Sequence, residues 1–151
     1  MPFLSLSFVD FRNIENNSID LFSKEVFFKG NNGQGKTNLL ESLYICSYGS
    51  SFRTKNENEL VKKNKNAYSI NALYKNEHEI TESISIKFEN GKKHILKNGK
   101  KIFDRKELIN TIPCIVFCHE DMDFITGEPE RRRFFLDQSI SLHNAMYIDS
   151  M

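Results

Sequence analysis

The chain has 151 residues, and its 21 Lys and Arg residues nearly balance its 20 Asp and Glu residues, so the formal net charge is +1. This near-neutral total excludes a basic tail or an acidic solvating protein. Hydrophobic residues make up 39% of the chain and aromatic residues 12%, which excludes a disordered chain. The length predicts one compact unit that covers residues 1–151.

The sequence has no segment of the kind that crosses a membrane. The longest apolar run, residues 114–118, is five residues long, whereas a spanning helix needs about 20. The first residues alternate apolar side chains with Ser5 and Ser7 and then meet Asp10, which does not fit a secretory signal. We therefore expect a cytoplasmic protein, and we interpret its three cysteines as buried thiols.

Two strands are predicted before a glycine-rich loop. Residues 3–9 alternate with period two and place Leu4, Leu6 and Phe8 on one face. Residues 26–28 form a second apolar segment directly before the loop, and the polar residues 16–18 favour a turn between the two.

A helix is predicted directly after the loop. In residues 36–47 the apolar side chains recur at three- and four-residue spacing, and Gly49 is the expected stop. The polar residues 54–66 predict a loop with one helical turn around Leu60.

An antiparallel β meander is predicted over residues 68–103. Its apolar segments cover residues 69–74, 80–88 and 94–97, and the dipeptides Asn90-Gly91 and Asn98-Gly99 favour two-residue hairpin turns. Beyond it, the pair Asp104 and Glu107 indicates a short helix, and residues 112–118 are predicted to form a buried strand. Pro129 is expected in the first turn of a final helix that continues through Ile140.

The most informative string is a loop that satisfies the pattern G-x-x-x-x-G-K-[ST]. Its residues are Gly30, Asn31, Asn32, Gly33, Gln34, Gly35, Lys36 and Thr37. Glycines let successive N–H groups converge on phosphate oxygens, and the loop leads into a helix N-terminus, which favours anions. Lys36 is expected to reach the β- and γ-phosphates, and the hydroxyl of Thr37 to bind Mg²⁺. The pattern therefore predicts a nucleoside triphosphate site.

A second acidic site for Mg²⁺ is harder to find. The one candidate is Asp121, which follows the predicted strand at residues 112–118 at the wrong spacing. The other interpretation is an acidic loop at the end of a strand.

Further motifs accompany the loop. They are Phe11-Arg12-Asn13, Asn38-Leu39-Leu40-Glu41, Ser51-Phe52-Arg53-Thr54, Val116-Phe117, Glu120-Asp121, Gly127-Glu128-Pro129, Arg132-Arg133 and Phe135-Leu136-Asp137. In this order, over essentially the whole chain, they resemble the N-terminal part of the RecF family of DNA replication and repair proteins.

The resemblance implies an α/β fold, the N-terminal lobe of an ABC- or SMC-like P-loop ATPase head, with ATP and Mg²⁺ as cofactors. In such heads ATP lies between the P-loop of one subunit and the signature motif of another, so it also implies an ATP-dependent homodimer. RecF-like proteins bind single-stranded or gapped duplex DNA. They act with RecO and RecR to load RecA, and they support replication and the SOS response. The signature motif, the Walker B strand and the helical arm of that family are not among these residues, so the chain is expected to be part of a longer protein and inactive alone.

The near-neutral net charge conceals two oppositely charged stretches. Residues 87–106 hold eight basic and two acidic residues, a net charge of +6, and residues 107–130 hold six acidic residues and no Lys or Arg. The predicted hairpins carry the candidate DNA-binding residues Lys92, Lys93, Lys100 and Lys101, and Arg53 is a further candidate. The alternative for these lysines is a solvated sheet edge.

Two other functions stay open. One is another P-loop ATPase head, such as an SMC-like or phage-defence ATPase. The other is a non-catalytic DNA-binding fragment. DNA-dependent ATPase activity is expected at most in a full-length dimer.

Overall fold

The structure is a computed structural model, and it describes residues 3–104, 107–108, 111–117 and 129–143. The chain divides into two compact units, Met1–Ile112 and Pro113–Met151.

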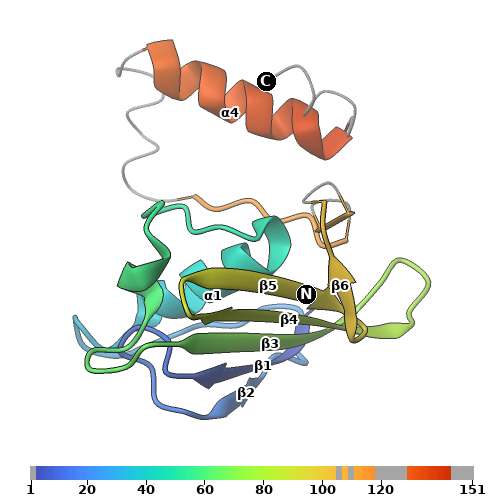
Figure 1. The fold of residues 1–151 in the computed structure, drawn as a ribbon. Helices are drawn as coiled ribbons and strands as arrows, with labels where there is room; N and C mark the ends of the chain where they lie inside the picture. Colours follow the sequence, from blue (N-terminus) through green and yellow to red (C-terminus); the bar gives the residue numbers. More distant parts are fainter. Residues whose placement is uncertain (1–2, 105–106, 109–110, 118–128, 144–151) are drawn as a thin grey trace. The chain divides into compact units, whose positions relative to one another are not determined.

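The first unit contains a six-stranded antiparallel sheet with the strand order β2-β1-β3-β4-β5-β6 (Figure 1). Its strands are β1 Phe3–Val9, β2 Ser18–Asp20, β3 Tyr68–Lys75, β4 Thr81–Glu89, β5 Lys92–Lys97 and β6 Lys100–Ile102. The connection between β2 and β3 contains two helical segments, α1 Lys36–Tyr48 and the 3₁₀ helix η1 Glu57–Leu60. The α/β fold class and the antiparallel meander predicted from the sequence are confirmed.

Tight turns fix the pairing of the last three strands. Asn90 and Gly91 have φ angles of 50° and 70°, and Asn98 and Gly99 have φ angles of 50° and 77°. Positive φ at both central residues is the geometry whose twist matches that of paired strands. Each Asn-Gly dipeptide therefore makes a two-residue hairpin, as predicted.

Helix α1 packs against β3 and β4 on one face of the sheet (Figure 1). Alternate residues of β3, namely Tyr68, Ile70, Ala72 and Tyr74, are buried on that face. From Glu41 onward every residue of α1 is buried. Gly49 ends the helix in a left-handed conformation, with its N–H donating to the carbonyl of Ile45, so the predicted helix and its stop are confirmed.

Two clusters of similar composition lie at the two ends of β3. The hydroxyl of Tyr68 donates to Glu57, which also accepts from Lys93. The hydroxyl of Tyr74 donates to Glu82, whose carboxylate lies 3.3 Å from the ammonium of Lys97. Burial raises the pKa of both tyrosines well above the usual range. Both phenols therefore stay protonated and act as donors to the carboxylates.

The second predicted strand is misplaced. Residues 26–28 are not a strand, and Phe27 is 86% exposed. The strand that follows β1 is β2, which pairs antiparallel with β1 and sets Leu6 opposite Ile19. A strand needs a neighbour for its N–H and C=O groups. The edge of β1 pairs with β2, which is nearer to β1 in the sequence than residues 26–28 are.

The strand predicted at residues 112–118 is also wrong, because residues 112–117 contain no strand. The last residue of that prediction, Cys118, lies outside the described residues. Ile112 is buried in the first unit. Glu107 and Leu108 are helical, as the Asp104 and Glu107 pair predicts.

The second unit contains one helix among its described residues, α4 Pro129–His143, which begins at the predicted proline. Across the described ranges, no helix is long and apolar enough to cross a membrane.

Candidate nucleotide-binding site

The glycine-rich loop of residues 30–37 leads directly into the N-terminus of α1 at Lys36. Gly33 and Gly35 have φ angles of +82° and +93°, values that a residue with a Cβ adopts only at a cost. A Cβ on Gly35 would lie 2.9 Å from Oδ1 of Asn13. Both glycines are therefore required by the backbone, and Gly35 also by a close neighbour.

The backbone N–H groups at the start of α1 have no protein acceptor within the described part of the chain. This holds for Gly35, Lys36 and Thr37, and no side chain caps the helix. Unpaired N–H groups at a helix N-terminus carry a partial positive charge. The loop therefore offers several donors and a favourable field to an anion.

Two side chains of the loop fold back over it. The ammonium of Lys36 donates to the carbonyls of Gly30 and Asn31 at 2.8 Å and 2.7 Å. The side-chain oxygen of Gln34 accepts from the N–H of Asn31 at 2.8 Å. The cation that the motif supplies is therefore already held over the loop.

Thr37 is exposed at the second position of α1. A single hydroxyl fits Mg²⁺, which usually takes few protein ligands and completes its shell with phosphates and water. Within the described part of the chain, no group of three or more His, Cys, Asp or Glu side chains could hold a metal. Asp121, the candidate second acid, lies outside the described residues.

Glu41 lies behind the loop as a fully buried carboxylate. The guanidinium of Arg12 donates two hydrogen bonds to this carboxylate, from Nε to Oε2 at 3.0 Å and from Nη2 to Oε1 at 2.8 Å. Arg53 approaches Oε2 at 3.3 Å, and the hydroxyl of Ser51 donates to Oε1 at 2.5 Å. One buried charge therefore joins the turn after β1, the helix α1 and the loop at residues 51–54.

A chain of amides connects this cluster to the glycine loop. Arg53 Nη1 donates to Oδ1 of Asn38 at 2.8 Å, and Nδ2 of Asn38 donates to Oδ1 of Asn13 at 2.7 Å. Nδ2 of Asn13 then donates to the carbonyl of Gly33 at 2.7 Å. We call these four groups the hydrogen-bond relay. The predicted site residues did not include Asn38 or Glu41, although a carboxylate on the apolar side of a predicted helix was a usable signal for Glu41.

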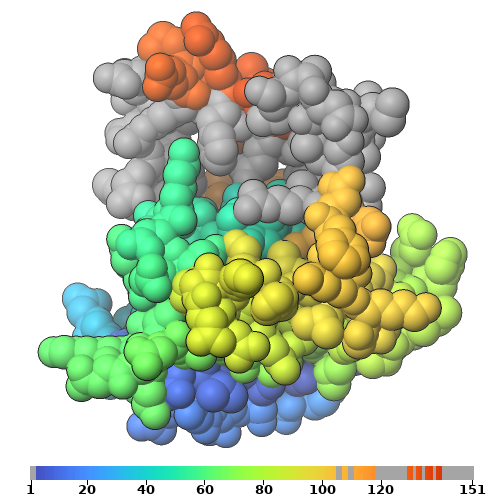
Figure 2. Space-filling model, viewed as in Figure 1, coloured from blue at the N-terminus to red at the C-terminus, as the bar shows by residue number. Residues whose placement is uncertain are grey.

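The candidate DNA-binding residues fall into two groups. Lys92, Lys100 and Lys101 are exposed on β5 and β6, whose surface is visible in Figure 2. Lys101 also lies 5.0 Å from the ring centroid of Phe103. Lys93 instead donates to the carbonyl of Gly49 and to Glu57, and Arg53 belongs to the relay. The exposed lysines are free to meet a phosphate backbone, whereas Lys93 is held by the fold.

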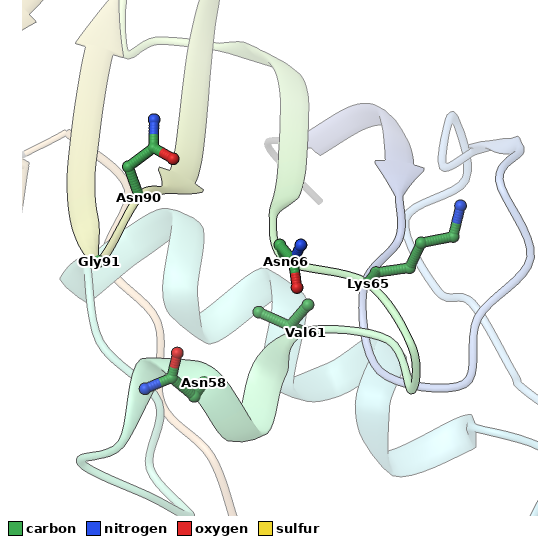
Figure 3. Close-up of a pocket in the computed structure, with 6 residues that line it drawn as sticks. All are labelled: Asn58, Val61, Lys65, Asn66, Asn90 and Gly91. Atoms are coloured by element: carbon green, nitrogen blue, oxygen red, sulfur yellow. The ribbon is translucent and has the colours of Figure 1, made fainter.

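A hollow of about 390 Å³ lies between η1, the segment after it and the β4–β5 turn (Figure 3). It is lined by Asn58, Val61, Lys65, Asn66, Asn90 and Gly91. No residue of the glycine loop lines it, so it is separate from the candidate nucleotide site.

The glycine loop, the helix that it enters and the antiparallel sheet define the N-terminal lobe of a P-loop ATPase head. A family model described as an AAA domain matches residues 5–145, and the chain therefore belongs to that family.

The resemblance to the N-terminal part of RecF is confirmed by relatives and by solved structures. The chain is 53% identical over 143 residues to the DNA replication and repair protein RecF of Treponema pallidum (strain Nichols), covering 93% of this chain and 40% of the relative. It is 38% identical to RecF of Clostridium novyi (strain NT), covering 97% and 41%. A solved structure of the recombination mediator protein RecF–ATP in the RecFOR pathway matches with a TM-score of 0.86 and 30% identity, over 95% of this chain and 40% of that one. The chain thus spans about 40% of the length of these relatives.

Proposed function

We propose that this chain is the ATP-binding lobe of a RecF-like protein of DNA replication and repair. The observation that carries the proposal is the glycine loop, whose positive-φ glycines precede unpaired N–H groups at the N-terminus of α1. The matching solved structures are described as RecF–ATP and RecF–ATPrS in the RecFOR pathway, which supports ATP as the nucleotide.

Each loop residue has a role in this proposal. The N–H groups of Gly35, Lys36 and Thr37 bind phosphate oxygens, and the ammonium of Lys36 leaves the carbonyls of Gly30 and Asn31 to pair with the β- and γ-phosphates. The remaining residues Asn31, Asn32, Gly33 and Gln34 complete the cradle. The hydroxyl of Thr37 holds Mg²⁺, which supplies charge neutralisation between the phosphates when bound.

DNA contact is a further part of the proposal. The exposed Lys92, Lys100 and Lys101 would neutralise phosphates of single-stranded or gapped duplex DNA. The larger protein would dimerise around ATP, act in the cytoplasm with RecO- and RecR-like proteins to load a RecA-like protein, and serve the SOS response. These properties rest on the RecF relatives, whose names support a role in DNA replication and repair in general.

Titration of the chain with a fluorescent ATP analogue and Mg²⁺ tests the nucleotide site. Lys36→Ala removes the ammonium and is expected to weaken binding by at least about tenfold. Lys24→Ala removes an exposed lysine outside the loop and is expected to bind like the unmodified chain. Equal affinity of Lys36→Ala and the unmodified chain would contradict the assignment.

A hydrolysis assay separates the alternatives. We expect this chain alone to bind nucleotide weakly and to show no turnover. DNA binding without any nucleotide binding would instead favour a non-catalytic DNA-binding fragment.

A further inference from the structure

The hydrogen-bond relay has a fixed direction. A guanidinium carries only donors, so the contact from Arg53 turns the side-chain oxygen of Asn38 toward Arg53 and its amino group toward Asn13. Asn13 must then present its oxygen to Asn38, which leaves its amino group for the carbonyl of Gly33. The guanidinium of Arg53, which can only donate, thereby decides which way the amide of Asn13 faces the glycine loop.

The last bond of the relay sets the orientation of one peptide unit. The peptide between Gly33 and Gln34 is planar and trans, so its C=O and N–H point in opposite directions. With the carbonyl held on Asn13, the N–H of Gln34 is directed away from Asn13. That N–H has no protein acceptor among the described residues. Gly33 has φ of +82°, and a Cβ at this residue would meet no atom within 4 Å, so without the relay this peptide would be free to turn.

Glu41 supports the relay at two points, next to Asn13 and at Arg53. It pairs with Arg12, the residue before Asn13, and with Arg53, the first donor of the relay. Arg12 is further fixed because its N–H donates to the carbonyl of Leu60 and its Nη1 donates to the carbonyl of Glu59, each at 2.8 Å. The buried carboxylate thus keeps Asn13 and Arg53 in place together.

We propose that Asn13 is a positioning residue for the phosphate loop, kept in its donating orientation by Arg53 through Asn38, so that the N–H of Gln34 is preset for a phosphate oxygen. This inference rests on the proposed nucleotide function. Its physical basis is preorganisation, because a loop that is already oriented loses less conformational freedom when the anion binds.

Three substitutions in this chain test the relay, with affinity measured by the fluorescent ATP analogue and stability by urea unfolding. Asn13→Ala and Asn38→Ala are each expected to weaken nucleotide binding by about five- to tenfold, the equivalent of one hydrogen bond. Asn38→Asp still accepts from Arg53 but cannot donate to Asn13. We expect its stability to be unchanged or higher and its affinity to fall. Since Asn38→Ala adds no charge, a loss common to both variants is not caused by the new carboxylate.

The double variant Asn13→Ala/Asn38→Ala separates positioning from general damage. If Asn38 acts only through Asn13, the double variant loses no more affinity than Asn13→Ala alone. Glu57→Gln is the matched control, because Glu57 accepts from Tyr68 and Lys93 without contacting the loop. It is expected to lose stability and keep its affinity for the nucleotide.

The outcomes distinguish the two proposals. Loss of affinity in the Asn13 and Asn38 variants, with Glu57→Gln unaffected, supports the relay. Normal affinity in both single variants, with weakened binding by Lys36→Ala, overturns the relay and leaves the nucleotide site standing. Normal affinity of Lys36→Ala overturns the nucleotide site itself, and the relay's role with it.

Discussion

The guanidinium of Arg12 and the carboxylate of Glu41 form a two-point ion pair that joins the turn after β1 to the middle of α1. The carboxylate is fully buried, and the Arg12 side chain is 17% exposed. Arg12 has φ of 51°, an uncommon conformation for a residue with a side chain, and the ion pair helps to hold it there. The pair therefore connects the turn after β1 to α1, and the neighbouring Asn13 extends this connection to the carbonyl of Gly33 in the glycine loop.

Breaking this pair is expected to be costly. Arg12→Met leaves Glu41 buried with the longer contact to Arg53 and the hydroxyl of Ser51, so the free energy of unfolding should fall by about 3 kcal/mol. Urea unfolding followed by circular dichroism measures it. Lys75→Met is the matched control, because it breaks the Lys75–Glu79 pair, whose side chains are 45% and 76% exposed. There we expect less than about 1 kcal/mol, and equal losses would contradict burial as the cause.

Two glycines of the loop are expected to respond differently to a methyl group. In Gly33→Ala the added methyl group meets no atom within 4 Å. Its free energy of unfolding should fall only by about 1–2 kcal/mol, the cost of placing a residue with a Cβ in the left-handed conformation. Gly35→Ala adds a contact of 2.9 Å with Asn13 Oδ1, so it should displace Asn13 and be less stable than Gly33→Ala. Thermal unfolding of both variants gives the comparison. A Gly35→Ala protein as stable as Gly33→Ala would show that Asn13 moves aside freely.

The exposed hairpin lysines are expected to set the salt dependence of DNA binding. Replacing Lys92, Lys100 and Lys101 by Ala should weaken binding to any sequence and reduce the slope of log K against log salt by about two to three. Fluorescence anisotropy with labelled single-stranded and gapped DNA measures the slope. A control with Lys24, Lys55 and Lys63 changed to Ala loses the same charge from other exposed positions. If both triple variants behave alike, net charge rather than the hairpins governs binding.

Glu82 is expected to contribute to stability in a pH-dependent way. The hydrogen bond from Tyr74 holds the pKa of Glu82 below its usual value of 4.5, with Lys97 adding to the effect. A carboxylate whose pKa is lowered by folding stabilises the protein above its unfolded pKa, and this contribution is lost as the pH falls through the folded pKa.

The measurement compares Glu82→Gln with the unmodified chain. The difference in unfolding free energy should be largest near neutral pH and shrink below about pH 4.5. Glu25→Gln, at an exposed position, should show no such difference. A Glu82→Gln difference that is constant from pH 7 to pH 3 would contradict the ionic contribution.

Local features of this protein follow from the sequence alone. The alternation of Leu6 and Phe8 in β1, the Asn-Gly hairpins, the glycine that ends α1 and the proline that begins α4 all depend on a few neighbouring residues, because φ, ψ and side-chain period are local properties. The same alternation predicts a buried Leu4, but a register shift between Phe3 and Ser5 leaves Leu4 half-buried and buries Phe3 instead. The glycine loop is another such local feature, because the positions of its glycines set the conformation of its backbone.

The tertiary structure decided the features that need a distant partner. Residues 26–28 are as apolar as a strand, yet the free edge of β1 is taken by β2. The helical pattern places Glu41 among apolar residues, but it does not identify Arg12 and Arg53 as the partners of its carboxylate.

The different exposure of Lys92 and Lys93 also cannot be predicted from the sequence alone. They are adjacent, equally charged and next to the same turn. The pairing of β5 with β4 sets Lys93 opposite Phe88, on the buried face beside Glu57, and sets Lys92 opposite Glu89. The chain by itself determined that both are cations on a hairpin. Only strand register, which follows from packing across the whole sheet, decided which of them meets solvent.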